Sequence, residues 1–378
     1  MSTPDLSFNN LPDLQNFLIG NGVPFASFRL PGDSEPHTLI SDGSYLKHLS
    51  VAEVFEQGPG FVMAPFFREE PLLYFRNKFI IKGFGFQPFF SVAPKANTDL
   101  PASVFTPDSK SSYIRMIDNT VQRIKSGEAE KVVISRIIET EKLSPSELSL
   151  LFSVLCESHP QAFVYVAHFP GQGLWAGASP ELLLNASEGK VATIALAGTR
   201  KSGETVEWGQ KEKEEQEWVS RFIGESMTEA GCSNIQVSET RTVSAGNVEH
   251  LLTDFHAFAD DNIVPLLIDA LHPTPAVCGW PKQDAYRIIR ETETYKRSYY
   301  TGFLGPVNNH GNTSLFVNLR CLQVLKDKTL IYAGGGITAA SDPASEWEET
   351  ELKSRNILSA IEKLRNLASE SEIPLHEK

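Results

Sequence analysis

Residues 342–358 have the sequence DPASEWEETELKSRNIL, in which an Asp-Pro pair precedes Glu346 and Glu349, three residues apart. Asp-Pro is a typical helix start, and on a helix this spacing places both carboxylates on one side. The same side becomes apolar farther along, from Ile357 onward. We therefore expect a helix from residue 343 whose carboxylates point toward the rest of the protein rather than into bulk water.

A second segment, QKEKEEQEWVSRFI at residues 210–223, has the same design. Glu212 and Glu215 lie three residues apart, and their side of the helix becomes apolar from Val219 onward. Carboxylates turned inward repel one another unless a positive charge lies among them, and a hard divalent cation with oxygen ligands meets that need. The alternative is a solvated, glutamate-rich helix face, to which we assign three other residues, Glu214, Glu217 and Glu348.

The balance of charge restricts the partners. The chain of 378 residues carries 34 Lys and Arg against 47 Asp and Glu, a formal net charge of −13. Such an acidic protein has little to neutralise phosphate groups, which argues against nucleic acid and anionic membranes as partners. If the substrate is an anion, positive groups near the site must overcome the field of the whole protein.

The opening residues and the cysteines indicate a cytoplasmic protein. The first residues, MSTPDLSFNNLPDLQ, are polar and lack a basic stretch, so we do not expect a signal peptide. No apolar run approaches the roughly 18 residues of a membrane-spanning helix. The four cysteines are scattered without metal-binding spacing and are expected to be reduced thiols: Cys156, Cys232, Cys278 and Cys321.

Strand-like segments outnumber helical ones and come in runs, which predicts sheets with helices packed outside rather than a regular βαβ repeat. Residues 1–100 form a β-rich N-terminal part, and residues 95–110 are polar and contain proline, typical of a linker. Residues 110–370 contain the segments with candidate chemistry, and we expect both parts to form one integrated domain. Among the helices, one over about 207–229 should end at Gly231.

Two residues could form an acid–base pair. Lys131 opens the strand KVVISR, where burial would lower the pKa of its amine far enough for it to act as a base. Glu181 lies between Pro180 and three leucines, where burial would raise the pKa of its carboxyl and suit it to act as a general acid. The alternative for both is a strand-end side chain that reaches into solvent.

Three further positions could bind an anion. Arg320 lies in FVNLRC, predicted as an apolar strand, and an arginine there needs a carboxylate partner from the protein or the substrate. The glycines at residues 334–336 allow close backbone approach, so backbone N–H groups could bind an anion, although a plain tight turn is the alternative. His250 lacks metal-ligand spacing, and by itself it is expected to be a core or surface histidine.

Taken together, these segments resemble the chorismate-utilising enzymes: isochorismate and salicylate synthases and the large components of anthranilate and aminodeoxychorismate synthases. The resemblance runs from about residue 110 to 365, and residues 1–100 match weakly. It implies an α/β (α+β) fold in which two central mixed β-sheets have helices packed outside, in α/β/β/α layers. The segments that carry it occur in this order: KVVISR, GASPELLL, ALAGTR, KEKEEQ, VEHLLT, HPTPAVCG, LRC, AGGGI and DPASEWEETELK.

The resemblance also implies roles for the acidic residues. Glu215 and Glu349 would be direct Mg²⁺ ligands, with Glu212 and Glu346 as supporting carboxylates. The metal ion would bind the ring carboxylate of chorismate, so the cation rather than the net charge of the protein would receive the anion. Where the family usually has histidine after the metal-binding glutamate, this chain has Gln216, which puts the support of Glu215 in question.

The remaining implied residues surround the substrate. Arg320 and Gly336 would hold the enolpyruvyl carboxylate, with Gly198 and His250 near the ring. Lys353, one turn beyond Glu349, would join the charge network. These roles follow from the resemblance alone.

Lys131 decides between branches of the family, because the members that add water at C2 of chorismate resemble this chain in having lysine there, as the base. Isochorismate formation is therefore the expected activity, with Glu181 protonating the departing C4 hydroxyl and no glutaminase subunit required. Ala276 is a second discriminator, since lyase-competent relatives tend to have threonine there. Salicylate synthesis is the first alternative and a non-catalytic ion- or anion-binding protein the second. Menaquinone and siderophore pathways both remain open.

Overall fold

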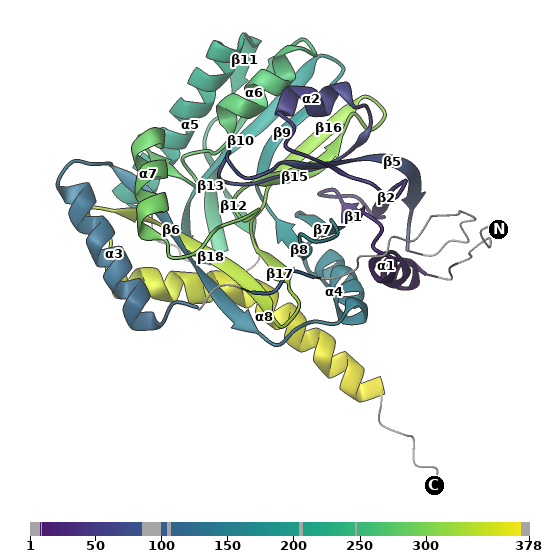
Figure 1. Ribbon diagram of the computed structural model, residues 1–378. Helices are drawn as coiled ribbons and strands as arrows, with labels where there is room; N and C mark the ends of the chain where they lie inside the picture. Colours follow the sequence, from purple (N-terminus) through teal and green to yellow (C-terminus); the bar gives the residue numbers. More distant parts are fainter. Residues whose placement is uncertain are drawn as a thin grey trace.

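Two β-sheets form the middle of the molecule, and helices cover their outer faces (Figure 1). The computed structural model describes residues 8, 10–84, 100–103, 107–203, 207–245 and 248–371. Parts of the expected linker, residues 95–99 and 104–106, lie outside the described residues. No helix in the described part is long and apolar enough to cross a membrane.

One sheet contains the strand that begins with Lys131. Each neighbour in it pairs antiparallel, and β6 lies between β14 and β18. In spatial order its strands are β14 (Gly279–Trp280), β6 (Lys131–Thr140), β18 (Thr329–Thr338), β17 (Cys321–Val324), β8 (Leu174–Ser179), β7 (Phe163–His168), β1 (Phe25–Arg29), β2 (His37–Ser41) and β5 (Leu73–Lys82).

The long strand β5 continues into the other sheet, because its first half pairs with β4 and its second half with β2. β3 (Leu46–Lys47) also pairs with β5, and β11 (Ser233–Val237) and β12 (Arg241–Ala245) both pair with β13. From β5 the order is β4 (Gly60–Ala64), β15 (Phe303–Val307), β16 (Asn312–Val317), β9 (Leu182–Ser187), β10 (Lys190–Lys201) and β13 (Val248–Phe258).

Helices pack on both outer faces. Apolar side chains of α1, α4 and α8 pack on the sheet of β7 and β8, and those of α5 and α6 on the sheet of β9 and β10. A third core, rich in aromatic residues such as Phe163 and Phe316, fills the space between the sheets. The helices are α1 (Leu11–Gly20), α2 (Val51–Glu56), α3 (Lys110–Lys125), α4 (Pro145–Ser158), α5 (Gln210–Ala230), α6 (Ile263–Leu271), α7 (Lys282–Thr292) and α8 (Pro343–Ser371).

The layered α/β/β/α fold class is confirmed, but the prediction that the sheets are mixed is wrong. Every strand pairing among the described residues is antiparallel. The reason is that many neighbouring strands are also neighbours in sequence, such as β7 and β8, and short turns can join only antiparallel strands. The N-terminal strands are part of the same sheets, since β1 pairs with β7 and β4 with β15.

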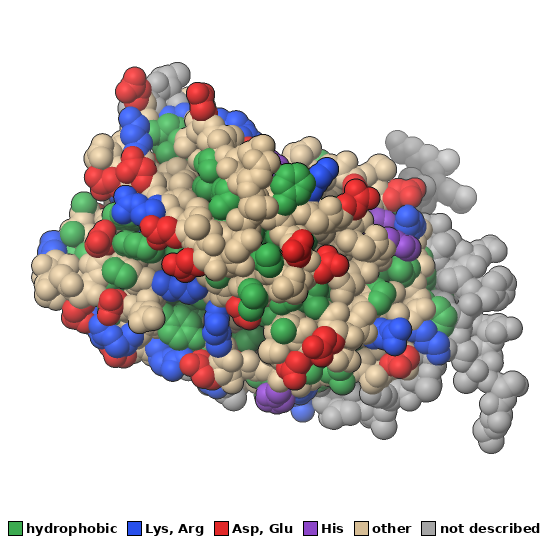
Figure 2. All heavy atoms as spheres, turned by 90° about the horizontal axis from the view of Figure 1, so that it is seen from above, with side chains coloured by type: hydrophobic (Ala, Val, Ile, Leu, Met, Phe, Trp, Pro, Cys, Tyr) green, Lys and Arg blue, Asp and Glu red, His purple; other side chains and the backbone are tan. Residues whose placement is uncertain are grey.

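Local helix signals agree with the structure. α8 begins at Pro343, and the Ser144–Glu147 capping box precedes α4. α5 ends at Gly231, whose φ of 93° is favourable for glycine. The four cysteines form no disulfide. On the face in Figure 2, basic and acidic side chains are interspersed, without a continuous basic surface of the kind that binds nucleic acid.

Candidate active site

A cavity of about 210 Å³ opens where β6 and β18 meet α5 and α8. It is lined by residues from both sheets, so neither sheet could form it alone. Of the twelve residues predicted to form the site, two, Glu212 and Glu346, do not line it. The other ten do: Lys131, Glu181, Gly198, Glu215, His250, Ala276, Arg320, Gly336, Glu349 and Lys353.

Lys131 begins β6 and is only 3% exposed. Its Nζ lies 3.2 Å from Oε2 of Glu215, on α5, and the two form an ion pair. Gly336, on the neighbouring strand, makes room for the lysine, because a Cβ there would lie 2.7 Å from Lys131 Cε. Alternation along the strand thus places the amine in the cavity, as the sequence pattern predicts.

Glu181 directly precedes β9 and is 5% exposed. Burial raises the pKa of its carboxyl to about 7, although the charge of Lys131 and a hydrogen bond from Thr274 act in the opposite direction. Thr274 Oγ1 donates to Oε1 at 3.5 Å. The expected buried glutamate is therefore present, and a large fraction of it is un-ionised near neutral pH.

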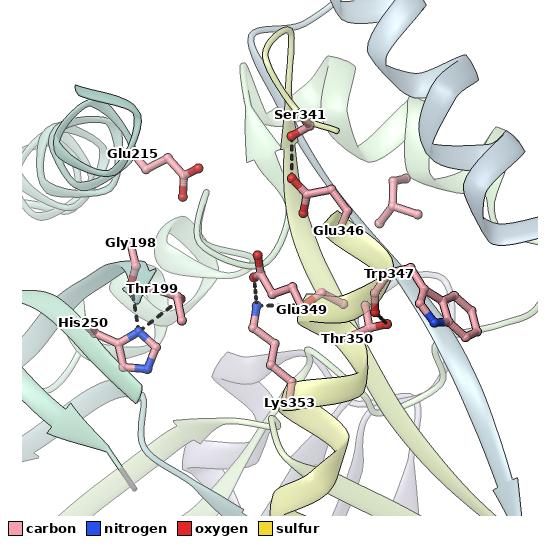
Figure 3. A network of polar contacts seen from close by, with 12 residues as sticks. Gly198, Thr199, Glu215, His250, Ser341, Glu346, Trp347, Glu349, Thr350 and Lys353 are labelled. Atoms are coloured by element: carbon pink, nitrogen blue, oxygen red, sulfur yellow. Dashed lines mark hydrogen bonds and ion pairs between the residues drawn. The ribbon is translucent and has the colours of Figure 1, made fainter. Parts of the chain in front are cut away.

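On α8, Glu346 and Glu349 face the cavity region as their spacing predicts (Figure 3). Lys353 Nζ lies 2.6 Å from Glu349 Oε1 and 2.9 Å from the carbonyl oxygen of Gly334. Burial acts to raise the pKa of Glu349, but the charge and hydrogen bond of Lys353, together with the charges of Lys211 and Lys131, outweigh it and the pKa is lowered. The pKa of Glu346 is raised, first by burial and then by the charge of Glu349.

Glu346 is the more deeply buried of the two, at 3% exposed. Its Oε1 accepts a hydrogen bond from Ser341 at 2.6 Å and lies 3.4 Å from Lys211 Nζ. Its Oε2 has no hydrogen-bond partner in the described part of the chain. That oxygen lies 3.0 Å from the position of a Cβ on Gly335, so the glycine leaves space beside it.

Glu212, in the first turn of α5, does not line the cavity, and its carboxylate lies near the start of the helix. Its Oε2 lies 2.6 Å from where a Cβ on Gly209 would be, next to the unpaired N–H groups at the start of the helix. A carboxylate there is stabilised by the helix dipole. The structure therefore brings Glu215, Glu346 and Glu349 to one region and leaves Glu212 at its edge.

No group of three His, Cys, Asp or Glu side chains within the described ranges is already arranged as a metal site. Each of three carboxylates instead pairs with a lysine: Glu215 with Lys131, Glu346 with Lys211, and Glu349 with Lys353. Oxygen-only ligands and the unpartnered Oε2 of Glu346 nonetheless suit a hard divalent cation. Figure 3 shows Glu215 extending from one side and Glu346 and Glu349 from the other.

Gln216, which replaces the usual histidine, is buried and faces the sheet rather than Glu215. Its Nε2 donates to the carbonyl oxygen of Ala195 at 3.1 Å and to Thr253 Oγ1 at 2.9 Å. The side chain therefore fixes α5 to β10 and β13, and it orients Glu215 only through the position of the helix.

Arg320 and His250 also line the cavity. Burial lowers the pKa of His250 to about 4, so its ring is neutral at pH 7. Nδ1 lies 2.8 Å from the carbonyl oxygen of Gly198 and donates to it, which leaves Nε2 to accept from Arg320 Nη2 at 3.4 Å. No carboxylate pairs with Arg320 in the described residues, and burial lowers the pKa of its guanidinium to about 10.

The prediction that Arg320 lies within a strand is wrong. β16 ends at Val317 and β17 begins at Cys321, and Arg320 has a left-handed φ of 47°. Asn318 stabilises this break between the strands. Its Oδ1 accepts a hydrogen bond from Tyr165 Oη at 2.6 Å, and its Nδ2 donates to the carbonyl oxygen of Tyr299 at 2.9 Å. Those long-range partners are absent from the local pattern, and the turn directs Arg320 into the cavity.

Sequence reasoning missed several residues near the site. Thr274 lies within HPTPAVCG, and Lys211 is four residues before Glu215, so their motifs offered a signal. Arg297 and Glu293 form a buried ion pair at 2.6 Å, with side chains 0% and 2% exposed. Arg297 also donates to the carbonyl oxygens of two residues that line the cavity, Val133 at 2.6 Å and Val277 at 3.0 Å.

Comparison with known proteins shows the family to which the chain belongs. The family model described as "Chorismate binding enzyme" matches residues 91–362. Isochorismate synthase EntC of Escherichia coli (strain K12) is 28% identical over 263 residues, 67% of each chain. The vibriobactin-specific isochorismate synthase of Vibrio cholerae is 31% identical over 295 residues, 72% of this chain and 73% of its own. Anthranilate synthase component 1 of Acetivibrio thermocellus is 32% identical over 67% of this chain and 53% of its own.

Solved structures have the same fold. A putative 2,3-dihydroxybenzoate-specific isochorismate synthase, DhbC from Bacillus anthracis, superposes with a TM-score of 0.76 at 22% identity, covering 92% of this chain and 99% of its own. MenF, the menaquinone-specific isochorismate synthase from Escherichia coli, also has a TM-score of 0.76, at 20% identity, covering 95% and 94%. At these identities the structures support the fold alone.

Proposed function

Because this chain belongs to the family of chorismate-binding enzymes, we propose that it is a Mg²⁺-dependent isochorismate synthase. The observation that carries the proposal is the cavity itself. A buried lysine, Lys131, and a buried glutamic acid with a pKa of about 7, Glu181, line the same space. Two groups of opposite acid–base character are what a reaction with one proton removed and one donated requires.

The proposed reaction exchanges one oxygen substituent for another on the chorismate ring. Lys131 takes a proton from a water molecule whose oxygen bonds to C2. It does so as the free amine, so its ion pair with Glu215 must first break, as it would if Glu215 bound the cation. The ring double bonds migrate, the C4–O bond breaks, and Glu181 gives its proton to the departing hydroxyl, which leaves as water. One water is consumed and one released, so no oxidant or cofactor electron is needed.

Substrate binding uses the charges at the two ends of the cavity. Arg320 would pair with the enolpyruvyl carboxylate, since no carboxylate pairs with it in the described part of the protein. Glu215 and Glu349 would hold Mg²⁺, supported by Glu346 and Glu212. A bound Mg²⁺ would supply positive charge that neutralises the ring carboxylate.

Ala276 supports isochorismate as the final product. This small apolar residue lines the cavity, so no hydroxyl is present there to assist the elimination of pyruvate. Thr274 is nearby, but its hydroxyl donates to Glu181. We assign the amine of Lys131, which lines the cavity, as the base that activates water, and we propose a reaction that uses water rather than ammonia and needs no glutaminase partner.

Product analysis tests this proposal. The purified protein is incubated with chorismate and MgCl₂, with and without excess EDTA, and the products are separated by chromatography. Isochorismate should form only where free Mg²⁺ is present. Salicylate with pyruvate would identify the lyase activity instead, and unchanged chorismate that still binds would indicate a non-catalytic protein. Undiminished turnover after exhaustive chelation would contradict the metal assignment.

A further inference from the structure

We infer that Lys211 is a tethered counter-ion that competes with the divalent cation for Glu346 and leaves this carboxylate when the cation binds. The inference rests on the proposed metal site and adds a residue outside the set predicted from the sequence. Lys211 is the second residue of α5, and its Nζ lies 3.4 Å from Glu346 Oε1, on α8.

The burial and the hydrogen-bond partners of Glu346 are the first observations that support the inference. Its side chain is 4% exposed, so its charge requires a positive partner. One oxygen has Lys211 and Ser341 as partners, and the other has no hydrogen-bond partner among the described residues. A dication would meet both the unpartnered oxygen and the negative charge that Lys211 now balances.

Lys211 differs from the other two lysines of the site in its freedom to move. Lys131 has a side chain 3% exposed, and Lys353 is anchored by the carbonyl oxygen of Gly334 at 2.9 Å. Lys211 is 36% exposed and does not line the substrate cavity. Its one recorded hydrogen-bond partner in the described part of the protein is Glu346.

A surface groove next to Lys211 provides space for its ammonium group once that group leaves Glu346. The groove is lined by Lys211 together with acidic residues, which also attract cations from solution. After leaving Glu346, the ammonium would remain near negative charge and in water, so its displacement costs little. The acidic residues of this groove are Glu128, Glu130, Glu214 and Asp284.

Electrostatics make simultaneous occupation unfavourable. Burial acts to lower the pKa of Lys211, but the charges of Glu346, Glu215 and Glu349 outweigh it and the pKa is raised. The ammonium is thus subject to the charges of all three carboxylates at the proposed metal site. A second positive charge in the same space is repelled, so the lysine and the cation exclude each other.

Direct binding of MgCl₂, measured by isothermal titration calorimetry without substrate, tests the inference on the intact protein. Lys211→Gln should bind Mg²⁺ about tenfold more tightly than the parent, because the competing charge is gone. Lys213→Gln is the matched control: it removes the same charge two residues away on the exposed side of α5 and should stay within about twofold of the parent.

Lys211→Arg keeps the charge and should bind no more tightly than the parent. If Mg²⁺ binds the parent and Lys211→Gln equally, the metal site stands and the inference is wrong. If Mg²⁺ binds neither, both the metal site and the inference are wrong.

Thermal unfolding provides a second measurement. In EDTA, Lys211→Gln should have a lower Tm than the parent, because Glu346 loses its counter-ion. Saturating MgCl₂ should raise the Tm of Lys211→Gln by more than it raises that of the parent or of Lys213→Gln, since tighter binding gives more stabilisation. An equal rise in all three proteins would overturn the inference, since a purely structural lysine would not change the response to Mg²⁺.

Discussion

Two regions of the site treat charge in opposite ways, and we call them the paired end (Glu215, Glu346 and Glu349) and the unpaired end (Arg320). At the end formed by α5 and α8, each of three carboxylates already has a lysine partner. At the other end, Arg320 has only the neutral ring of His250 as a hydrogen-bond partner in the described part of the chain. A buried cation without a counter-ion is costly, and this cost supports the proposal that the substrate supplies an anion here.

This contrast distinguishes charged groups that already have a partner from a charged group that lacks one. Where a carboxylate already has a lysine partner before substrate binds, a new cation must displace that lysine. The affinity for the cation therefore depends on this competition. Where an arginine lacks a carboxylate partner, the ligand itself neutralises the charge. The affinity for that ligand therefore depends on its direct contact with the arginine. The paired end should therefore respond to changes in metal concentration, and the unpaired end to changes in substrate concentration.

The largest expected effect lies between the two ends, at the acid–base pair. Lys131→Ala and Glu181→Gln should each lower kcat by about 10²–10⁴-fold, because each removes one proton transfer. Circular dichroism and substrate binding should remain close to those of the parent. Full activity in either folded variant would remove that residue from the mechanism.

Arg297→Met should break a structural pair behind the cavity and destabilise the fold. Glu293, with its side chain 2% exposed, would be left as an unpaired buried charge, at a cost of about 3–5 kcal/mol in the free energy of unfolding. Urea denaturation measures this. Lys211→Gln, at the paired end, should cost less by the same measurement, because Lys211 is 36% exposed and Ser341 still donates to Glu346. Equal losses would mean that both pairs serve stability alone.

Arg320→Met should raise KM for chorismate by about 10–150-fold with a smaller change in kcat, since it removes a charge-assisted contact worth about 1.5–3 kcal/mol. Arg320→Lys should recover part of the affinity, because it restores the charge but not the planar geometry. Steady-state kinetics at saturating MgCl₂ measure both. An unchanged KM would show that the unpaired end does not bind the substrate.

The last prediction changes the conditions rather than the sequence and concerns the pH dependence of the acid. Glu181 has a pKa of about 7, so it holds the proton it must donate below that pH and loses it above. The rate should therefore fall as pH rises through about 7, approaching tenfold per pH unit, provided that chemistry limits the rate. A pH–rate profile from pH 6 to 9 checks this. A flat profile would indicate that Glu181 is not the acid.

Features that depend on neighbours in the sequence could be predicted. The start of α8 at Pro343 and the C-cap of α5 at Gly231 agree with their local signals. The burial of Lys131 and Glu181 also follows from the apolar residues around them. Proximity of the two glutamate segments was expected only through the resemblance, because helix spacing by itself says nothing of which helices meet.

Features that depend on distant partners could not be predicted. The break at residues 318–320 requires Tyr165 and Tyr299, which the chain brings to Asn318 only after both sheets have formed. The antiparallel pairing of the sheets depends likewise on which strands become neighbours. Glu212 lies on the expected helix, yet its carboxylate is beside the helix N-terminus and outside the lining of the cavity.

The sequence by itself determined which residues carry charge and which side of each helix they occupy, because helix and strand periodicity are properties of the local backbone. Only the tertiary structure decided which charges meet. Lys131 pairs with Glu215 across 84 positions of sequence and Lys211 with Glu346 across 135, whereas Arg320 ends without a carboxylate in the described part of the molecule. Charge pairing in a buried site depends on distance in space, and packing of the two sheets and their helices sets that distance.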